Sequence, residues 1–502
     1  MFHEDQIVFR IGALTDPHIS YENYTGQMVA DAAARYTAAM AAFKKVSGNR
    51  LDGIISMGDY TSIGSKEQVE SFISVEKAVM KDLFADAPTK PKHAIGYGNH
   101  DTCWGVEEDY YLGVPGWEAL YRPSGLLDDY EADSAFGEGG GNYHVKLEKD
   151  GHTFHLLALE IDYYHANAHY SEERLAWIDA MLDKLTKEEP NAYLLVGAHS
   201  PIRESGVYGV DMDLERMADW AKSELGGIHE VVKKYPQVIF LSGHTHLTNY
   251  FETSIMQKDY TAINVAGSYW HSLWGGACPY LDDMFSEEHT GMAMYFEVDA
   301  NGNIRITRLN LTEATVRTEN EFISFDNIPN PNKKSREQYP FIGKIEMTAC
   351  RYVDGDVPTY GDPWILEAPK PDGSHLAPYS AKRGEVPAPE FGEGQFGIEN
   401  VTEENGKTSF DLSFPAAERK AGLVHHYIIN LFDESHHLVK EYWAAGDWCD
   451  VTTGVVDGKT HRDAKQFCYR VETENLGPVF TAELTPMDEY KNCGKTVILS
   501  SR

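Results

Sequence analysis

Side chains that bind metal ions through nitrogen or oxygen occur in five short blocks of this sequence, each of which follows a short apolar run. The residues are Asp16 and His18 in T-D-P-H, Asp59 in G-D-Y, Asn99 in G-N-H-D, His199 in A-H-S-P, and His244 and His246 in G-H-T-H. Ligands held at strand ends by rigid neighbours are what a preorganised metal site requires. None of these residues is a thiolate, and the single amide needs neighbours that orient it. The pattern therefore predicts a metal centre with nitrogen and oxygen ligands.

The order of the blocks resembles the pattern of the calcineurin-like metallophosphoesterase family, which runs D-x-H, G-D, G-N-H-D/E, H and G-H-x-H. Every element of that pattern is present between Asp16 and His246, and the resemblance covers about residues 1–310. A single G-D or G-H-x-H is common by chance, whereas a complete set in register is not. The resemblance implies a four-layer α/β fold, in which a β-sandwich is flanked by helices, and an enzyme that hydrolyses phosphate esters.

The resemblance also implies two divalent metal ions, which neutralise phosphoryl oxygens and generate hydroxide near neutral pH. Asp59, the G-D aspartate, is expected to bridge them. The expected ligands that join it are Asp16, His18 and His246 on the first metal, and Asn99, His199 and His244 on the second. Ligands of these types suit Mn, Fe or Zn and leave the choice among them open. Gly98 and Gly243, which precede two of the ligands, are expected to let the backbone turn sharply beside the site.

Two residues after Asn99 are expected to act outside the metal shell. By the same resemblance, His100 stabilises the transition state and protonates the leaving oxygen, a role suited to the intrinsic pKa of histidine. Asp101 is expected to hold the His100 ring through its other nitrogen. A metal-bridging hydroxide would attack phosphorus directly, so no Ser or Cys nucleophile and no covalent phosphoenzyme are expected.

Short apolar runs alternate with helical patterns through the first part of the chain, which indicates a layered α/β domain. The predicted strands are Ile7–Leu14, Gly53–Met57, His93–Gly96, Thr153–Leu159, Tyr193–Gly197 and Gln237–Ser242, followed by a hairpin of Met292–Val298 and Asn303–Leu309. Helical spacing of apolar residues covers residues 69–83 and 175–185, and the Ala-rich segment 31–43 is predicted as a third helix from its propensity. The ligand blocks lie where strands are followed by loops, the usual place for ligands in open α/β sheets.

The composition changes after this region, and we predict three segments: a metallophosphoesterase domain at 1–315, a linker at 316–342, and an all-β sandwich domain at 343–502. The predicted sandwich strands are Thr408–Phe414, Val424–Phe432, Leu438–Trp443, Gln466–Val471 and Val479–Leu484. The segment Leu484–Tyr490 resembles the tyrosine-corner region of fibronectin type III domains. His425-His426 and His436-His437 are interpreted as strand and turn residues of this domain.

Bulk composition limits the partners of the 502-residue chain. A net charge of −34 argues against a nucleic-acid polymer, which would be repelled. It does not exclude a small phosphorylated substrate, because bound cations dominate the local field. No apolar stretch is long enough for a transmembrane helix. The N-terminus lacks the basic and apolar regions of a signal peptide. We therefore expect a cytoplasmic protein, or a secreted or cell-envelope protein if a leader has been removed.

The leading functional prediction is hydrolysis of small phosphodiesters, including cyclic nucleotides, because family members with this motif set and an added C-terminal domain resemble phosphodiesterases of that type. A phosphomonoesterase or nucleotidase is an alternative, since the same metals attack either ester. A third hypothesis is a binding protein whose sandwich domain attaches to a cell-surface polymer or a protein partner. A role in lining the pocket is left open for Arg203, Tyr60 and Trp270-His271. The segment 103–141 could cover the pocket.

Overall fold

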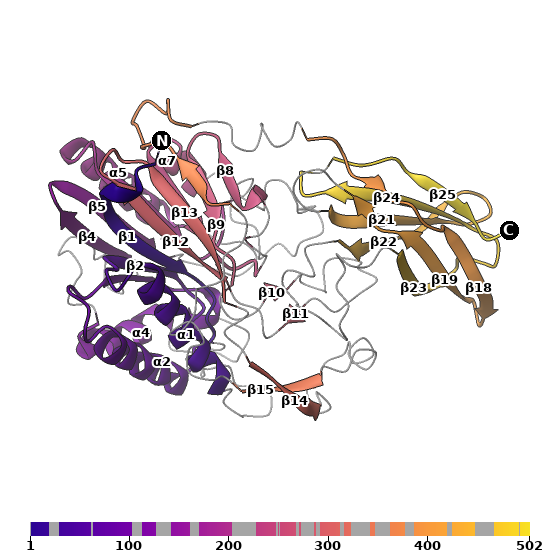
Figure 1. The fold of residues 1–502 in the computed structure, drawn as a ribbon, viewed down its shortest axis with the longest axis horizontal. Helices are drawn as coiled ribbons and strands as arrows, with labels where there is room; N and C mark the ends of the chain where they lie inside the picture. Colours follow the sequence, from indigo (N-terminus) through magenta and orange to yellow (C-terminus); the bar gives the residue numbers. More distant parts are fainter. Residues whose placement is uncertain are drawn as a thin grey trace.

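The alternating apolar runs and helical segments form stacked layers in this computed structural model (Figure 1). The structure describes residues 2–19, 30–61, 64–102, 113–126, 142–160, 170–202, 227–246, 249, 252–267, 271–272, 286–287, 292–311, 316–322, 342–346, 362–376, 386–418, 424–446, 466–490 and 492–502. These ranges include all the candidate metal ligands, together with His100 and Asp101. Arg203 and Trp270 lie outside them, as does most of the segment 103–141.

One mixed sheet is built around three parallel strands that are followed by ligand blocks. Its order is β16-β13-β12-β1-β2-β3. The bounds are β1 (Ile7–Leu14), β2 (Gly53–Met57), β3 (Lys92–Gly96), β12 (Met292–Asp299), β13 (Ile304–Asn310) and β16 (Trp364–Leu366). Strands β1, β2 and β3 run parallel, whereas β12 pairs with β1, β13 with β12 and β16 with β13, each in antiparallel fashion. The β12–β13 hairpin agrees with the sequence prediction, and β2 is buried along its whole length.

A second mixed sheet carries the remaining ligand blocks. Its order is β4-β5-β6-β7-β9-β8. The bounds are β4 (Tyr143–Lys149), β5 (His152–Leu159), β6 (Tyr193–Ala198), β7 (Val238–Ser242), β8 (Ile255–Gln257) and β9 (Thr261–Asn264). Strands β5, β6, β7 and β9 are parallel to one another, and the edge strands β4 and β8 are antiparallel to their neighbours.

The two sheets pack face to face through apolar side chains. Phe9 of β1 and Phe154 of β5 meet edge to face with ring centroids 5.5 Å apart. A Cβ on Gly197 of β6 would lie 2.8 Å from Met57 of β2, so the strands approach too closely for a larger residue. One apolar core contains residues of both sheets. These strands are covered on both faces, which explains why their residues are continuously apolar rather than alternately apolar and polar.

Helices cover the outer faces of the two sheets. On the first sheet lie α1 (Ala30–Val46), α2 (Lys66–Ala78), the π-helical turn η2 (Val79–Leu83) and α4 (Gly113–Tyr121). On the second lie α5 (Glu172–Glu188) and α7 (Ile228–Val232), whose apolar residues form a separate core with β6 and β7. Ser65 and Ser171 cap α2 and α5 by accepting backbone N–H bonds at the first turn. The order helix, sheet, sheet, helix agrees with the predicted α/β class.

The C-terminal part is an all-β sandwich that lies beside the layered part in Figure 1. One sheet contains β18 (Gly397–Glu404), β19 (Lys407–Pro415) and β23 (Gln466–Glu474), and the other contains β22 (Leu438–Ala445), β21 (Val424–Phe432), β24 (Thr481–Asp488) and β25 (Val497–Ser500). Their inner faces share one core that includes Phe410, Leu412, Tyr427 and Leu484. The likeness to fibronectin type III domains stays a prediction.

Two of the predicted boundaries differ from the structure. β16 (Trp364–Leu366) pairs with β13 in the first sheet, although the sequence analysis assigned it to the C-terminal domain. Trp364 is buried there and stacks under the Arg308 guanidinium, at 4.4 Å from the ring centroid, so this segment packs with the first sheet. The predicted linker at 316–342 also begins and ends in strands, because β14 (Val316–Phe322) pairs with β15 (Ile342–Glu346).

A buried carboxylate joins the two parts. The backbone N–H of Glu252, the first residue of the short 3₁₀ helix η5 (Glu252–Ser254), donates to Glu489 Oε2 of the C-terminal part at 2.6 Å. The Glu252 carboxylate in turn accepts from Arg308 and from Trp364 Nε1, both at 3.1 Å. The C-terminal part is therefore anchored to the segment that follows the G-H-T-H block.

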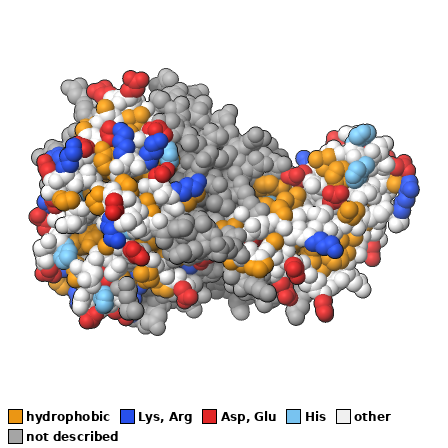
Figure 2. All heavy atoms as spheres, turned by 90° about the horizontal axis from the view of Figure 1, so that it is seen from above, with side chains coloured by type: hydrophobic (Ala, Val, Ile, Leu, Met, Phe, Trp, Pro, Cys, Tyr) orange, Lys and Arg blue, Asp and Glu red, His pale blue; other side chains and the backbone are white. Residues whose placement is uncertain are grey.

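The described surface mixes charges of both signs. On the face in Figure 2, basic side chains lie singly or in small groups among acidic ones. Among the described helices, none combines the length and apolar character that a membrane span needs.

Candidate metal centre

Every candidate ligand follows the carboxyl end of a parallel strand. Asp16 and His18 follow β1, Asp59 follows β2, Asn99 begins the short helix α3 (Asn99–Thr102) after β3, His199 follows β6, and His244 and His246 follow β7. Carboxyl ends of neighbouring parallel strands meet at one edge of a sheet. Because the two sheets also face each other, both sets of ends converge, and all these side chains are buried at 4% exposure or less.

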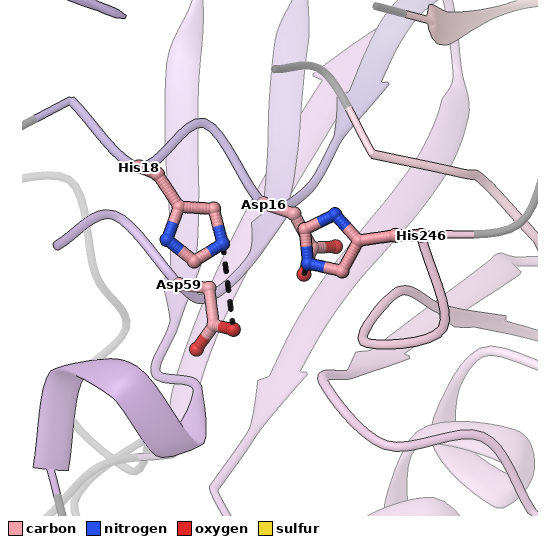
Figure 3. Close-up of side chains that lie close together, drawn as sticks. All are labelled: Asp16, His18, Asp59 and His246. Atoms are coloured by element: carbon pink, nitrogen blue, oxygen red, sulfur yellow. Dashed lines mark ion pairs between the residues drawn. The ribbon is translucent and has the colours of Figure 1, made fainter. Parts of the chain in front are cut away.

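The convergence forms two groups of potential ligand atoms that share one carboxylate. The first group is Asp16, His18, Asp59 and His246, and Figure 3 shows these side chains pointing toward one another. The second group is Asp59, His199 and His244. Within each group the ligand atoms lie within 4.8 Å of one another. Asp59 is common to both groups.

In the first group, histidine nitrogens face carboxylate oxygens. His246 Nε2 lies 3.2 Å from Asp16 Oδ1, and His18 Nε2 lies 3.8 Å from Asp59 Oδ2. Asp16 Oδ2 is already used, because it accepts from Thr15 Oγ1 at 2.6 Å and from His244 N at 3.0 Å. Asp16 Oδ1 is buried and accepts no hydrogen bond from the described residues. A buried carboxylate oxygen beside imidazole nitrogens is suited to bind a cation.

In the second group, several lone pairs converge on one nitrogen. His199 Nδ1–H donates to Met57 O at 2.7 Å, so Nε2 faces the group. Asp59 Oδ2, Asn99 Oδ1 and His244 Nδ1 all lie 3.1 Å from that Nε2. Two of these atoms are oxygens that cannot donate. Such a cluster is repulsive unless positive charge lies within it, and a divalent cation supplies that charge.

The electrostatics of these side chains support this interpretation. Burial acts to lower the pKa of His199, but the negative charges of Asp59 and Asp16 and hydrogen bonds to Asp59 and Met57 raise it to about 9. Burial acts to raise the pKa of Asp59, but the nearby His199 and His100 hold it well below its usual range. Burial, together with the neighbouring charges of His100 and His199 respectively, lowers the pKa values of His18 and His244, which keeps these rings neutral. A proton on His199 thus takes the place that a cation's charge would take.

Left-handed backbone conformations are concentrated at the ligands. The φ angles are +53° at Asp16, +41° at His18, +54° at Asp59, +66° at His244 and +51° at His246. Each such conformation costs about 1 kcal/mol or more for a residue with a Cβ and persists only where the surroundings enforce it. Backbone bonds between the blocks provide part of that enforcement, since Asp16 N donates to Gly58 O at 3.0 Å and His18 N donates to Asp59 O at 2.9 Å.

Glycines beside the ligands leave space for this interlocking. A Cβ on Gly58 would lie 2.2 Å from Gly98 N, and one on Gly98 would lie 2.0 Å from Asp59 Oδ1. A Cβ on Gly243 would lie 2.0 Å from Thr15 Oγ1. Only Gly58 of these has a positive φ, at +96°. Gly98 and Gly243 are required because neighbouring atoms approach closely, and the sharp turn expected at them stays a prediction.

His100 lies at the border of the buried cluster. Its side chain is partly exposed, unlike those of the ligands. Its ring meets the His18 ring edge to face with centroids 4.9 Å apart, and its backbone N–H donates to Asp59 Oδ1 at 2.9 Å. This position places an imidazole next to both ligand groups with access to solvent.

The Asp101 carboxylate has other partners than those expected. Oδ1 accepts from Thr61 N at 2.9 Å and Thr61 Oγ1 at 3.0 Å, and Oδ2 accepts from Gly98 N at 2.9 Å. These bonds tie the G-D-Y-T segment to the G-N-H-D segment rather than orienting the His100 ring. Burial and the charge of Asp59 raise the pKa of Asp101 to about 7, against the effect of these hydrogen bonds. The part played by Thr61 was missed from the sequence, although it directly follows the G-D-Y block.

The other residues considered from the sequence lie elsewhere. Tyr60 is fully buried and donates to Ser56 Oγ at 2.7 Å, so it does not line a pocket. His271 lies in the short strand β10 (His271–Ser272), which pairs with β11 (Ser286–Glu287). His425 and His426 are buried in β21, and His436-His437 form part of the exposed turn after it, as interpreted from the sequence.

Comparisons with known proteins place few limits on this chain. No protein-family model matches it, and no curated protein matches it. A purple acid phosphatase, PPD1 from yellow lupin (Lupinus luteus) seeds, is similar at 14% identity and a TM-score of 0.36 over 61% of this chain. The match spans about half, 52%, of that chain.

Two further solved structures are aligned over most of the chain at lower scores. A bacterial orthologue of human α-L-iduronidase gives 10% identity and a TM-score of 0.21, over 98% of this chain and 99% of that one. The glycoside hydrolase domain of Spr0440, Endo-D from Streptococcus pneumoniae R6, gives 9% and 0.15, over 97% of this chain and 81% of that one. Similarities at these TM-scores do not establish a function for this chain.

The close approach of Gly58 to Gly98 gives a matched test. Gly58→Ala and Gly151→Ala place the same methyl group at positive φ, +96° and +80°, but nothing lies within 4 Å of the Gly151 position. We expect Gly151→Ala to lower the free energy of unfolding by about 1 kcal/mol and Gly58→Ala to lower it by about 3 kcal/mol. Only Gly58→Ala should also weaken Mn²⁺ binding. Denaturant unfolding and metal titration measure both effects, and equal losses in the two variants would contradict the interlocking of the loops.

Proposed function

We propose that this protein is a phosphoester hydrolase that requires two divalent metal ions and acts on small phosphodiesters. The observation that carries the proposal is the shared carboxylate: Asp59 belongs to both buried ligand groups. A carboxylate common to two groups is what a two-metal centre needs, because it holds the cations a short distance apart. Asn99 completes the second group through Oδ1, which lies 3.1 Å from His199 Nε2.

The ligand types are compatible with metals that promote phosphoryl transfer. Imidazole, carboxylate and amide oxygen suit Mn, Fe or Zn. When bound, such a pair neutralises the phosphoryl oxygens and lowers the pKa of a water molecule that acts as the nucleophile. The protein's part is to hold the ligands rigidly, which the left-handed backbone and the cross-block hydrogen bonds achieve.

His100 is proposed to protonate the leaving oxygen. It is the partly exposed imidazole beside the buried cluster, and its backbone is fixed on Asp59 Oδ1. A group that meets substrate needs access that the buried ligands lack. Asp101 is proposed as a positioning residue that holds the loop of Asn99 and His100 against Thr61, because its carboxylate accepts from Gly98 and Thr61.

Charge supports a diester over a monoester. The two ligand groups consist of histidines and aspartates, with Asn99 beside the second group. A diester carries one negative charge at neutral pH, whereas a monoester dianion carries two and gains more from a cationic side chain. The net charge of −34 acts in the same direction, because it repels the more highly charged substrate more strongly.

The substrate preference is tested with paired chromogenic esters. We expect the Mn²⁺-loaded protein to show a higher kcat/KM for bis(p-nitrophenyl) phosphate than for p-nitrophenyl phosphate. Chelation should abolish both activities, and added Mn²⁺ should restore them. A preference for the monoester would support the phosphomonoesterase alternative. Failure to cleave either ester with any of Mn²⁺, Fe²⁺ or Zn²⁺ would contradict the proposal.

The role of His100 predicts a dependence on the leaving group. p-Nitrophenolate leaves without a proton, whereas an alkoxide does not. We expect His100→Asn to lower kcat on a 3′,5′-cyclic or dialkyl phosphodiester by about 10²-fold, the usual size of general acid catalysis, and to change p-nitrophenyl ester cleavage much less. Metal content, measured in the same samples, should stay unchanged. Equal losses on both kinds of ester would show that His100 is not the proton donor.

A further inference from the structure

A chain of buried polar side chains runs from the shared ligand to the outer helices. Tyr60, which follows Asp59, donates to Ser56 Oγ at 2.7 Å. Ser56 Oγ contacts His93 Nε2, and His93 Nδ1 lies 2.6 Å from Glu76 Oε1. The other oxygen of Glu76 accepts from the Tyr36 hydroxyl. All of these side chains are 4% exposed or less, and they come from α1, α2, β2, β3 and the loop after β2.

The donors and acceptors of this chain can be satisfied in one consistent direction. If His93 is neutral with its proton on Nδ1, it donates to Glu76, and Ser56 donates to the free Nε2. Ser56 Oγ then accepts from Tyr60, and Tyr36 donates to the remaining Glu76 oxygen. Burial and the charge of Glu76 raise the pKa of Tyr36 well above its usual range, so its hydroxyl remains a donor. Every hydrogen bond therefore leads to one buried carboxylate.

The same residue types occur in serine hydrolase triads, but the geometry here does not suit a nucleophile. Ser56 is fully buried inside β2, and its oxygen accepts the Tyr60 hydroxyl. Apolar rings close over the chain, since the Tyr60 ring stacks on Phe72 at 4.3 Å. A serine nucleophile must be exposed to its substrate. The arrangement is better explained by what it holds in place.

Tyr60 is continuous with the segment that supplies the shared carboxylate. The backbone at Asp59 is left-handed, at φ +54°, and such a conformation needs surroundings that enforce it. On one side, the backbone carbonyls of Gly58, Asp59 and Tyr60 accept from Asp16, His18 and Ile19 at 2.6–3.0 Å. On the other side, the Tyr60 side chain ties the segment to Ser56 and so to β3, α2 and α1. This tie adds to the bonds of Thr61 to Asp101, and it connects the segment to the helical layer.

We propose that Tyr60 is a positioning residue, and that the buried chain Tyr60–Ser56–His93–Glu76–Tyr36 keeps Asp59 in its ligand conformation before metal binds. The inference rests on the proposed two-metal function, because it assigns the chain to the ligand that both metals share. A merely structural role would not affect metal affinity, whereas this role predicts that loosening Asp59 weakens the binding of both metal ions together. The reason is that Asp59 would relax without metal and would have to be reordered on binding.

The test compares tyrosine hydroxyls that are matched in chemistry but not in place. Tyr60→Phe breaks the chain next to Asp59, and Tyr36→Phe breaks it at its far end. Tyr235→Phe is the control: its hydroxyl donates to Asp179 Oδ1 at 2.6 Å, and its ring packs in the other core, with α5 and α7. Binding is followed by the EPR signal of free Mn²⁺ during titration of the metal-free full-length protein, and stability by thermal unfolding.

We expect Tyr60→Phe to lower the affinity for both Mn²⁺ ions by about fivefold, the effect of one buried hydrogen bond. Tyr36→Phe should lower both affinities by less. Tyr235→Phe should lower the unfolding temperature with no change in Mn²⁺ affinity. If the native protein binds two Mn²⁺ and Tyr60→Phe binds them with native affinity, the inference is wrong although the proposed function stands. If the native protein itself fails to bind two Mn²⁺, the proposed function fails first.

Discussion

The structure depends on a convergence of electron-pair donors that is unfavourable without positive charge. Around His199 Nε2, the oxygens of Asp59 and Asn99 and a nitrogen of His244 all lie at 3.1 Å in a buried environment. Burial in low dielectric makes such a cluster costly unless a cation or proton offsets it. The elevated pKa of His199, about 9, records the same imbalance in the metal-free protein. The fold holds these atoms together despite their repulsion, and a bound cation that offsets the repulsion is the best explanation.

Most of the surrounding architecture serves to hold that convergence. Two sheets present the carboxyl ends of their parallel strands to each other, so ligands far apart in the sequence meet at one place. The strained backbone at the ligands is enforced by hydrogen bonds between blocks and by the contact of Gly58 with Gly98. On the far side of Asp59, the Tyr60 chain connects the ligand loop to the helical layer. The C-terminal sandwich supplies none of the proposed ligands and touches this system through Glu489 at η5.

The sequence predicted most features of the fold and the site that have a local pattern, and it missed features that depend on tertiary contacts. The buried parallel strands were predictable because both faces are covered, so runs such as Gly53–Met57 are continuously apolar. The edge strand β4 (Tyr143–Lys149) was missed although its apolar residues alternate with His, Lys and Glu, the pattern typical of a half-buried strand. β16 was misassigned because Trp364 and Leu366 form only a three-residue strand, whose burial against β13 is a tertiary effect. At the site, residue types and order suggested the ligands, whereas the bonds of Asp101 to Thr61 and Gly98 depend on how two loops meet, which no local pattern encodes.

The most direct test of the account is the number of metal ions lost when a single ligand is changed. Asp59 belongs to both groups and His246 to the first group alone. Equilibrium dialysis of the purified full-length protein against Mn²⁺, followed by elemental analysis, should therefore give two ions for the native protein, one for His246→Asn and none retained tightly by Asp59→Asn. Retention of both ions at native affinity by Asp59→Asn would contradict the claim that one carboxylate organises a two-metal centre.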